Sequence, residues 1–171
     1  METWDAIRAR RNVRSFTDEP IEAAALDQIL EAARRTPSSR NWQPWDFVVV
    51  TDREQLVELA TVWIGAGHIA GSAATIALVV PDYEEARDAA IAQYDLGQAT
   101  MSIMIAAADL GIGSGHSAVG EQELARRILG LPADRICSYL IALGHPAERP
   151  LAPLTRINRR PFEEVVHRDR F

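Results

Sequence analysis

The stretch that decides the fold runs from Ile91 to Leu110 and reads IAQYDLGQATMSIMIAAADL. Its Ala, Met, Ile and Leu residues would occupy nearly every side of a helix, and a helix that is apolar all round is buried. We predict one long helix over residues 84–110, which is either the central core helix or a helix packed against a partner subunit. Its small residues would let another backbone approach closely: Gly97, Ala99, Ser102 and Ala106.

The segments on both sides of this helix carry alternating helix and strand patterns. Helices are expected over residues 4–11, 21–35, 53–63 and 121–129, and strands over 46–51, 74–80 and 137–143. The Gly-rich run 111–115 ends the long helix, and the Pro- and Arg-rich segment 147–171 is expected to pack as an arm. The pattern predicts one domain over residues 1–171, of the α+β or α/β class, with a small sheet covered by helices.

The charge distribution limits the classes of partner. The chain has 171 residues, 47% of them apolar, and 18 basic against 24 acidic side chains give a net charge of −6. Every basic residue is Arg, which excludes a lysine Schiff base and a lysine-bearing phosphate loop. Residues 1–16 and 152–171 each carry +2, so the middle carries −10. Such an acidic body argues against nucleic-acid binding, but two basic ends that met in space could hold a small anion.

The remaining composition predicts a cytoplasmic protein with neither a disulfide nor a metal centre. Cys137 is the only cysteine, and it lies in an apolar strand where we expect an inert core thiol. The four histidines are far apart in sequence and show no metal-ligand spacing. The N-terminus lacks an apolar signal core, and no apolar run reaches membrane length. We therefore predict a soluble protein that does not contact membranes.

Two polar segments in the N-terminal half could carry chemistry. Arg10-Arg11-Asn12-Val13-Arg14 could surround a phosphate, because guanidinium groups match phosphate oxygens; the alternative is a solvated basic surface. The segment 36–45 (TPSSRNWQPW) is dense in short polar groups that could bond a heteroaromatic ring edge. Taken alone, it is also typical of a helix-to-strand turn whose two Trp side chains pack into the core.

Three further features are weaker. The run 111–116 (GIGSGH) could let backbone approach a flat ligand, or it is only a helix cap and turn. It follows a helix rather than a strand, so it is not a dinucleotide fingerprint. The segment 158–164 (NRRPFEE) is a second phosphate candidate or a soluble tail. Tyr94 and Asp95 on the long helix could be polar pocket residues, although packing is the better explanation.

Together these pieces resemble the FMN-dependent nitroreductase family. The segment 7–16 resembles its N-terminal flavin-phosphate motif, 36–47 is similar to its S-P-S-x-x-N-x-Q-P-W-x-F signature, and 158–167 resembles a common ending. The resemblance implies an α+β sandwich with a small mixed sheet, an intertwined homodimer with a C-terminal arm, and two FMN molecules at the interface. The flavin-binding residues it implies are Arg10, Arg11, Asn12, Arg14, Arg159 and Arg160 at the phosphate and ribityl, Pro37, Ser38, Ser39 and Asn41 from the other subunit, and Gly113 and Ser114 at the ring.

The implied activity is a ping-pong transfer of hydride from NAD(P)H, through FMN, to a nitroaromatic, quinone or similar acceptor. The flavin would carry the chemistry, so we expect no catalytic side chain. Three alternatives stay open: a specialised flavin or deazaflavin oxidoreductase, a non-catalytic flavin-binding module, and a helical dimerisation protein without flavin. The chain also departs from the family pattern at two points. Many relatives have a bulky residue where this chain has Gly115-His116, and some place a Lys near the flavin, which this chain lacks.

Overall fold

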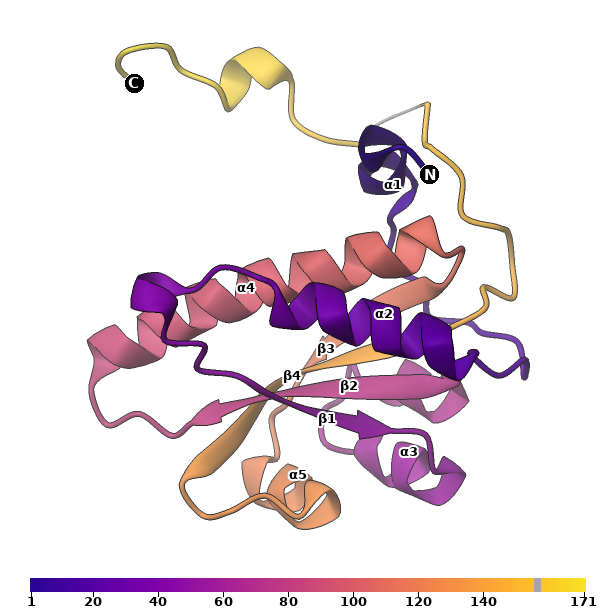
Figure 1. The fold of residues 1–171 in the computed structure, drawn as a ribbon, viewed down its shortest axis with the longest axis vertical. Helices are drawn as coiled ribbons and strands as arrows, with labels where there is room; N and C mark the ends of the chain where they lie inside the picture. The colour runs from indigo at the N-terminus through magenta and orange to yellow at the C-terminus, as the bar shows by residue number, and fades with distance from the viewer. Residues whose placement is uncertain (156–157) are drawn as a thin grey trace.

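A four-stranded sheet separates two layers of helices in the computed structural model, which describes residues 1–155 and 158–171 (Figure 1). The strands lie in the order β1-β2-β4-β3. Their bounds are Asp46–Val50 for β1, Ala74–Pro81 for β2, Gly113–Ala118 for β3 and Arg135–Gly144 for β4. The helices are α1 (Thr3–Ala9), α2 (Ala23–Arg34), α3 (Arg53–Leu59), α4 (Ala86–Asp109) and α5 (Gln122–Leu129), with short 3₁₀ turns at Ser39–Asn41, Gly67–Gly71 and Phe162–Glu164.

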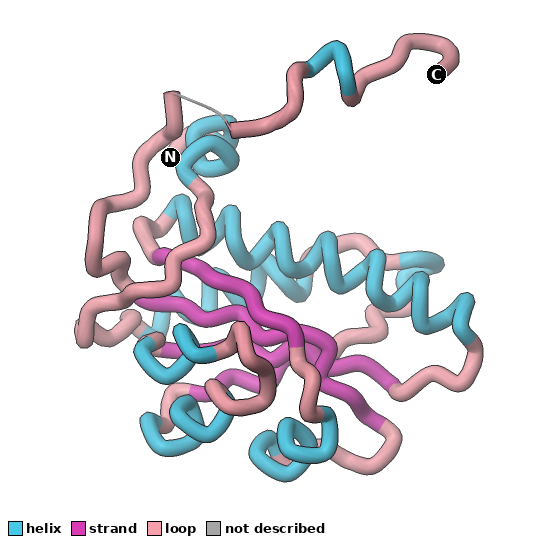
Figure 2. The backbone as a smooth tube through the Cα atoms, turned by 180° about the vertical axis from the view of Figure 1, so that it is seen from behind, coloured by secondary structure: helices cyan, strands magenta, loops and turns pink. Residues whose placement is uncertain are grey.

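The central strand β2 shows why the sheet is covered on both faces. Its ATIALVV run is apolar without alternation, as expected for a strand buried on two sides. Ile76 and Leu78 pack under α2 and α4, whereas Ala77 and Val79 pack on the layer that contains α3 and α5. Figure 2 shows the same strand layer between helices from behind. The predicted α+β class and helix-covered sheet are confirmed.

The sheet differs from the prediction in two ways. All pairings between the four strands are antiparallel, so the mixed sheet that we expected is wrong for the strands themselves; the parallel pairing is an isolated bridge between Asn12 and Ser114. In addition, β3 lies in the run that we predicted to be a break. Only its first part is a break: α4 ends, Gly111 takes a left-handed φ of 76°, and the chain then pairs with β4.

The long helix is buried on one side. Leu96, Ala99 and Ile103 belong to the core beneath α4, but Tyr94 is 73% exposed and Met101 is 37% exposed. The helix is thus a core helix that also presents an apolar outer face. None of the helices in the described ranges combines the length and hydropathy that a bilayer span requires.

The end of the chain runs away from the sheet as an arm (Figure 1). The first part of the arm returns past α1, where the Leu154 N–H donates to the Arg8 carbonyl at 3.2 Å. Residues 158–171 are all exposed in this single chain, apolar side chains such as Phe162 and Phe171 included. Arg156, counted above among the basic residues of this end, lies outside the described residues.

Candidate functional site

The N-terminal basic segment is held against the glycine-rich strand β3. The Val13 N–H donates to the Ser114 carbonyl at 2.9 Å, and Asn12 forms a parallel bridge with Ser114. The approach is close because Gly115 has no side chain: a Cβ there would lie 2.3 Å from the Val13 carbonyl oxygen. The fold therefore brings together two of the predicted segments, 10–14 and 113–114, although more than 95 residues separate them.

A histidine that the sequence did not single out supports this contact. His68 lies on the 3₁₀ turn Gly67–Gly71, and its Nε2 is 3.2 Å from the Gly115 carbonyl oxygen. Its Nδ1 is buried without a hydrogen-bond partner. The sequence signal that could have indicated it is the cluster of glycines around it, at positions 65, 67 and 71. The imidazole and Val13 thus both lie close to Gly115, where an added Cβ would meet them both.

Two basic side chains of this segment, Arg11 and Arg14, line a small polar cavity, whereas Arg10 is not among its lining residues. A hollow of about 150 Å³ is lined by residues 11–15 together with Pro146 and Glu148. The Arg11 Nη2 donates to the Arg149 carbonyl at 2.6 Å, and desolvation, followed by the positive charge of Arg149, lowers the pKa of Arg11. The Arg10 Nε is buried and has no hydrogen-bond partner. A buried donor without an acceptor is uncommon in folded proteins, so this group fits an anionic ligand.

The second predicted segment forms a strained turn at the other end of α4. Arg40, Asn41 and Gln43 have left-handed φ angles of 51°, 57° and 51°. The Ser38 Oγ accepts from the Gln43 N–H at 2.9 Å, and the Ser39 N–H donates to Asp95 of α4. Residues held in this sparsely populated region cluster at functional sites.

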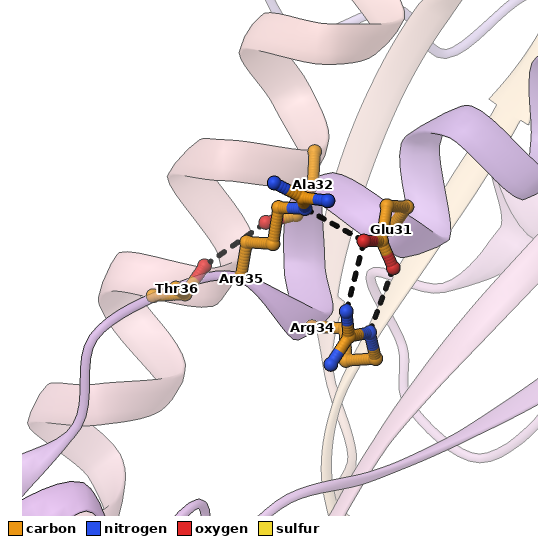
Figure 3. A network of polar contacts seen from close by, with 5 residues as sticks. All are labelled: Glu31, Ala32, Arg34, Arg35 and Thr36. Carbon is orange, nitrogen blue, oxygen red and sulfur yellow. Dashed lines mark hydrogen bonds and ion pairs between the residues drawn. The ribbon is translucent and has the colours of Figure 1, made fainter.

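The end of α2 fixes where this turn begins. In Figure 3, the Thr36 hydroxyl bonds the Ala32 carbonyl, and Glu31 accepts from both Arg34 and Arg35. The Thr36 and Ser102 hydroxyl oxygens also form a hydrogen bond at 2.9 Å, which ties the turn to α4. The hydrogen bonds from Arg34 and Arg35 lower the pKa of Glu31 to about 2. Because Glu31 is exposed, this ion pair contributes little stability.

No described hydrogen bond or bridge joins the two predicted segments within one chain. The polar contacts of residues 36–45 reach Asp95 and Ser102 of α4. Asn12 and Val13 instead contact Ser114 of β3. Arg159 and Arg160 are also apart from the basic segment: their described contacts go to Asn158 and Glu164 within the arm. In the single chain, the predicted residues therefore lie in three groups, and no described hydrogen bond joins one group to another.

The comparison with protein families decides the class of this fold. The sequence model described as "Nitroreductase family" matches residues 7–66 and 63–145, most of the chain. This chain belongs to the nitroreductase family. The match spans the basic segment, the strained turn and the glycine-rich strand, and it confirms the family resemblance predicted from the motifs.

Individual members of the nitroreductase family are similar over most of their length. An Archaeoglobus fulgidus protein whose name joins NADH dehydrogenase and NAD(P)H nitroreductase is 31% identical over 153 residues, 83% of this chain and 84% of that protein. The Bacillus subtilis FMN reductase (NAD(P)H) is 28% identical over 99% of this chain and 74% of its own. The solved FMN-dependent nitroreductase of Clostridium difficile is 25% identical with a TM-score of 0.85, over 97% of this chain and 98% of that one.

Proposed function

We propose that this nitroreductase-family protein is an FMN-dependent oxidoreductase that passes hydride from NAD(P)H to an electron-poor acceptor such as a nitroaromatic or a quinone. The names of its relatives support the flavin and the nicotinamide donor. In the structure, the observation that carries the proposal is the Arg10 Nε, which is buried and has no hydrogen-bond partner. It belongs to the segment whose backbone bonds to β3 at Val13. The donor set and the glycine-dependent contact fit a phosphate ester attached to a flat ring.

Each half of the proposed site has a distinct task. Arg10, Arg11, Asn12 and Arg14 bind the phosphate and ribityl chain, and Gly113 and Ser114 line the ring. Pro37, Ser38, Ser39 and Asn41 approach from a second copy, with Arg159 and Arg160 completing the phosphate contacts. We propose a homodimer built from one domain per chain, because no described hydrogen bond brings the turn and the basic segment together within one chain.

When bound, FMN supplies the two-electron chemistry that no side chain of this protein can provide. The chain's own residues bind and orient it. Donors such as a backbone N–H or an Arg guanidinium at the site stabilise negative charge electrostatically, which takes the place of the Lys that some relatives have. No side chain is assigned a proton-transfer step. Residues 1–171 therefore act as a binding and orienting scaffold, and we keep the cytoplasm as the predicted location.

Titration of the apoprotein with FMN tests the binding half of the proposal. We expect quenching of FMN fluorescence, and Arg10→Ala should raise the FMN Kd tenfold or more, because a hydrogen bond to a charged group is worth about 1.5–3 kcal/mol. The matched control is Arg127→Ala, which removes the same charge from the exposed side of α5. A wild-type protein that stays apo in excess FMN refutes the proposal.

Anaerobic mixing of the loaded protein with NADH or NADPH tests the catalytic half. We expect the visible absorbance of the oxidised flavin to bleach on the timescale of turnover. Addition of a nitroaromatic or a quinone should restore it. Bound FMN that neither nicotinamide reduces would instead identify a flavin-binding module without this activity. Reduction without reoxidation by these acceptors would point to a specialised oxidoreductase.

A further inference from the structure

Among the buried polar side chains of the described residues, one carries a carboxylate. The proposed function gives this side chain no role. Asp95 lies in the first half of α4 and is 1% exposed. None of the ion pairs between described residues involves it. A buried carboxylate without a cation is costly, and an apolar residue of similar size is often neutral or more favourable. Its presence therefore needs a reason other than stability.

The contacts of Asp95 point to the strained turn. Its Oδ2 accepts from the Ser39 N–H at 3.0 Å, and its Oδ1 accepts from the Gln98 side chain at 3.2 Å. The bond to Ser39 is charge-assisted. It joins α4 to the first residue of the 3₁₀ turn Ser39–Asn41, 56 residues earlier in the chain. Gln98 is one helical turn further along α4, so it orients the carboxylate without contacting Ser39 itself.

The turn needs such an anchor at each end. Arg40, Asn41 and Gln43 occupy the left-handed region, where a non-glycine residue persists only if its surroundings fix it. Ser38 fixes the far end through its bond from the Gln43 N–H. Asp95 fixes the near end through Ser39. Both anchors border one cavity of about 580 Å³ between the turn and the start of α4.

We propose that Asp95 is a positioning residue for the flavin site. It holds Ser39 so that Ser38 and Asn41, the latter already in its left-handed conformation, are presented to the FMN that the second copy binds. Without this carboxylate the turn relaxes and the cost of ordering it is added to each binding event, which weakens the flavin complex. This inference rests on the proposed function, since it assigns Asp95 a role toward the same ligand.

Two pairs of variants separate positioning from general stability. Asp95→Leu removes both acceptors at similar size, whereas Asp95→Asn keeps an oxygen that can accept from Ser39. From the other side, Ser39→Pro deletes the N–H donor and Ser39→Ala keeps it. Pro suits this position because Ser38 before it is extended (φ −138°, ψ 158°) and Ser39 starts a 3₁₀ turn. Each apoprotein is titrated with FMN, and its thermal midpoint is measured without FMN.

We expect Asp95→Leu and Ser39→Pro each to raise the FMN Kd about tenfold or more, relative to wild type and to Ser39→Ala respectively. Asp95→Asn should stay within about threefold of wild type. The apoprotein midpoint of Asp95→Leu should not fall, because the buried charge is gone. Should Asp95→Leu fail to fold, the Ser39 pair alone decides the question.

Two results overturn the inference while leaving the proposed function intact. In the first, Asp95→Leu and Ser39→Pro bind FMN as tightly as their controls. In the second, the Kd rises only in proportion to a lower thermal midpoint, as it would in Leu56→Ala, a buried truncation in the core on the opposite face of the sheet. A wild-type protein that binds no FMN rejects the proposed function and, with it, the flavin role of Asp95.

Discussion

Gly115 shows how one residue controls the approach of two distant segments. Its missing side chain leaves room for both the Val13 carbonyl and the His68 ring. A rotamer change cannot relieve a clash with backbone, so any Cβ here forces residues 12–14 away from β3.

We therefore expect Gly115→Ala to lower stability by about 1–3 kcal/mol, as overpacking does, and to weaken FMN binding. The measurements are thermal unfolding of the apoprotein and an FMN titration. Gly71→Ala is the control, because a Cβ at Gly71 meets nothing within 4 Å. If the two variants unfold at the same temperature, the packing of Val13 on Gly115 does not constrain the fold.

Cys137 gives a prediction about pH. Burial raises the pKa of its thiol to about 12, from an ordinary value near 9. Below pH 9 the thiol is neutral in both folded and unfolded chains. Between about pH 9 and 12 the unfolded chain loses the proton while the folded chain keeps it, so Cys137 lowers the stability of the fold as pH rises through this range.

A thiol reagent tests this environment directly. At pH 8 we expect Cys137 to react with a disulfide reagent only after denaturant is added, because the thiolate is the nucleophile and burial suppresses it. The free energy of unfolding of Cys137→Ser should fall less steeply between about pH 9 and 12 than that of the wild type, because this thiol no longer titrates. Rapid labelling of the native protein would contradict the buried, neutral state.

At the scale of elements, α4 combines a core face with an apolar outer face. Tyr94, Gly97 and Met101 are exposed and follow the i, i+3, i+7 spacing of one helix face. A hollow of about 280 Å³ lies beside it, lined in part by Met104, His116 and Tyr139. The sequence could not separate the two roles of this helix, because both require apolar residues. Only the packing shows which side the core takes.

We expect Met101→Asp to convert the proposed homodimer to monomer, because a charge at a buried apolar interface loses its hydration. Sedimentation velocity measures the change. Val57→Asp is matched, since Val57 is also apolar and 51% exposed but lies on α3, across the sheet. Equal sedimentation of both variants as dimers would show that α4 does not form the interface.

At the scale of the whole molecule, residues 158–171 of the arm are exposed and are not packed against the rest of the chain. Residues 158–171 expose large apolar side chains, Phe162 and Phe171 among them, and carry Arg159 and Arg160. Figures 1 and 2 agree that this segment extends away from the sheet. An arm of this composition cannot bury its apolar side chains alone, so we expect it to lie on a second copy.

A chain ended after Leu154 should therefore dimerise less tightly and bind FMN less tightly. The double variant Arg159→Ala/Arg160→Ala keeps the arm, so it should remain dimeric while its FMN Kd rises and becomes less sensitive to salt. Sedimentation and FMN titration at two salt concentrations distinguish the truncated chain from the double variant. A truncated chain with unchanged dimer and Kd would make the arm a dispensable tail.

The sequence by itself determined the elements whose patterns are local. The apolar run of β2, the periodic face of α2 and the length of α4 each follow from side chains a few residues apart, and the motif order identified the family. It could not specify β3, whose GSGHSA has no β-branched or aromatic residue. That segment is a strand because β4 offers it a hydrogen-bonding edge. The bonds of Asp95 with Ser39 and of His68 with Gly115 were equally invisible, since they join residues 56 and 47 positions apart. Such contacts form only when the sheet and α4 are in place, so tertiary structure alone decided them.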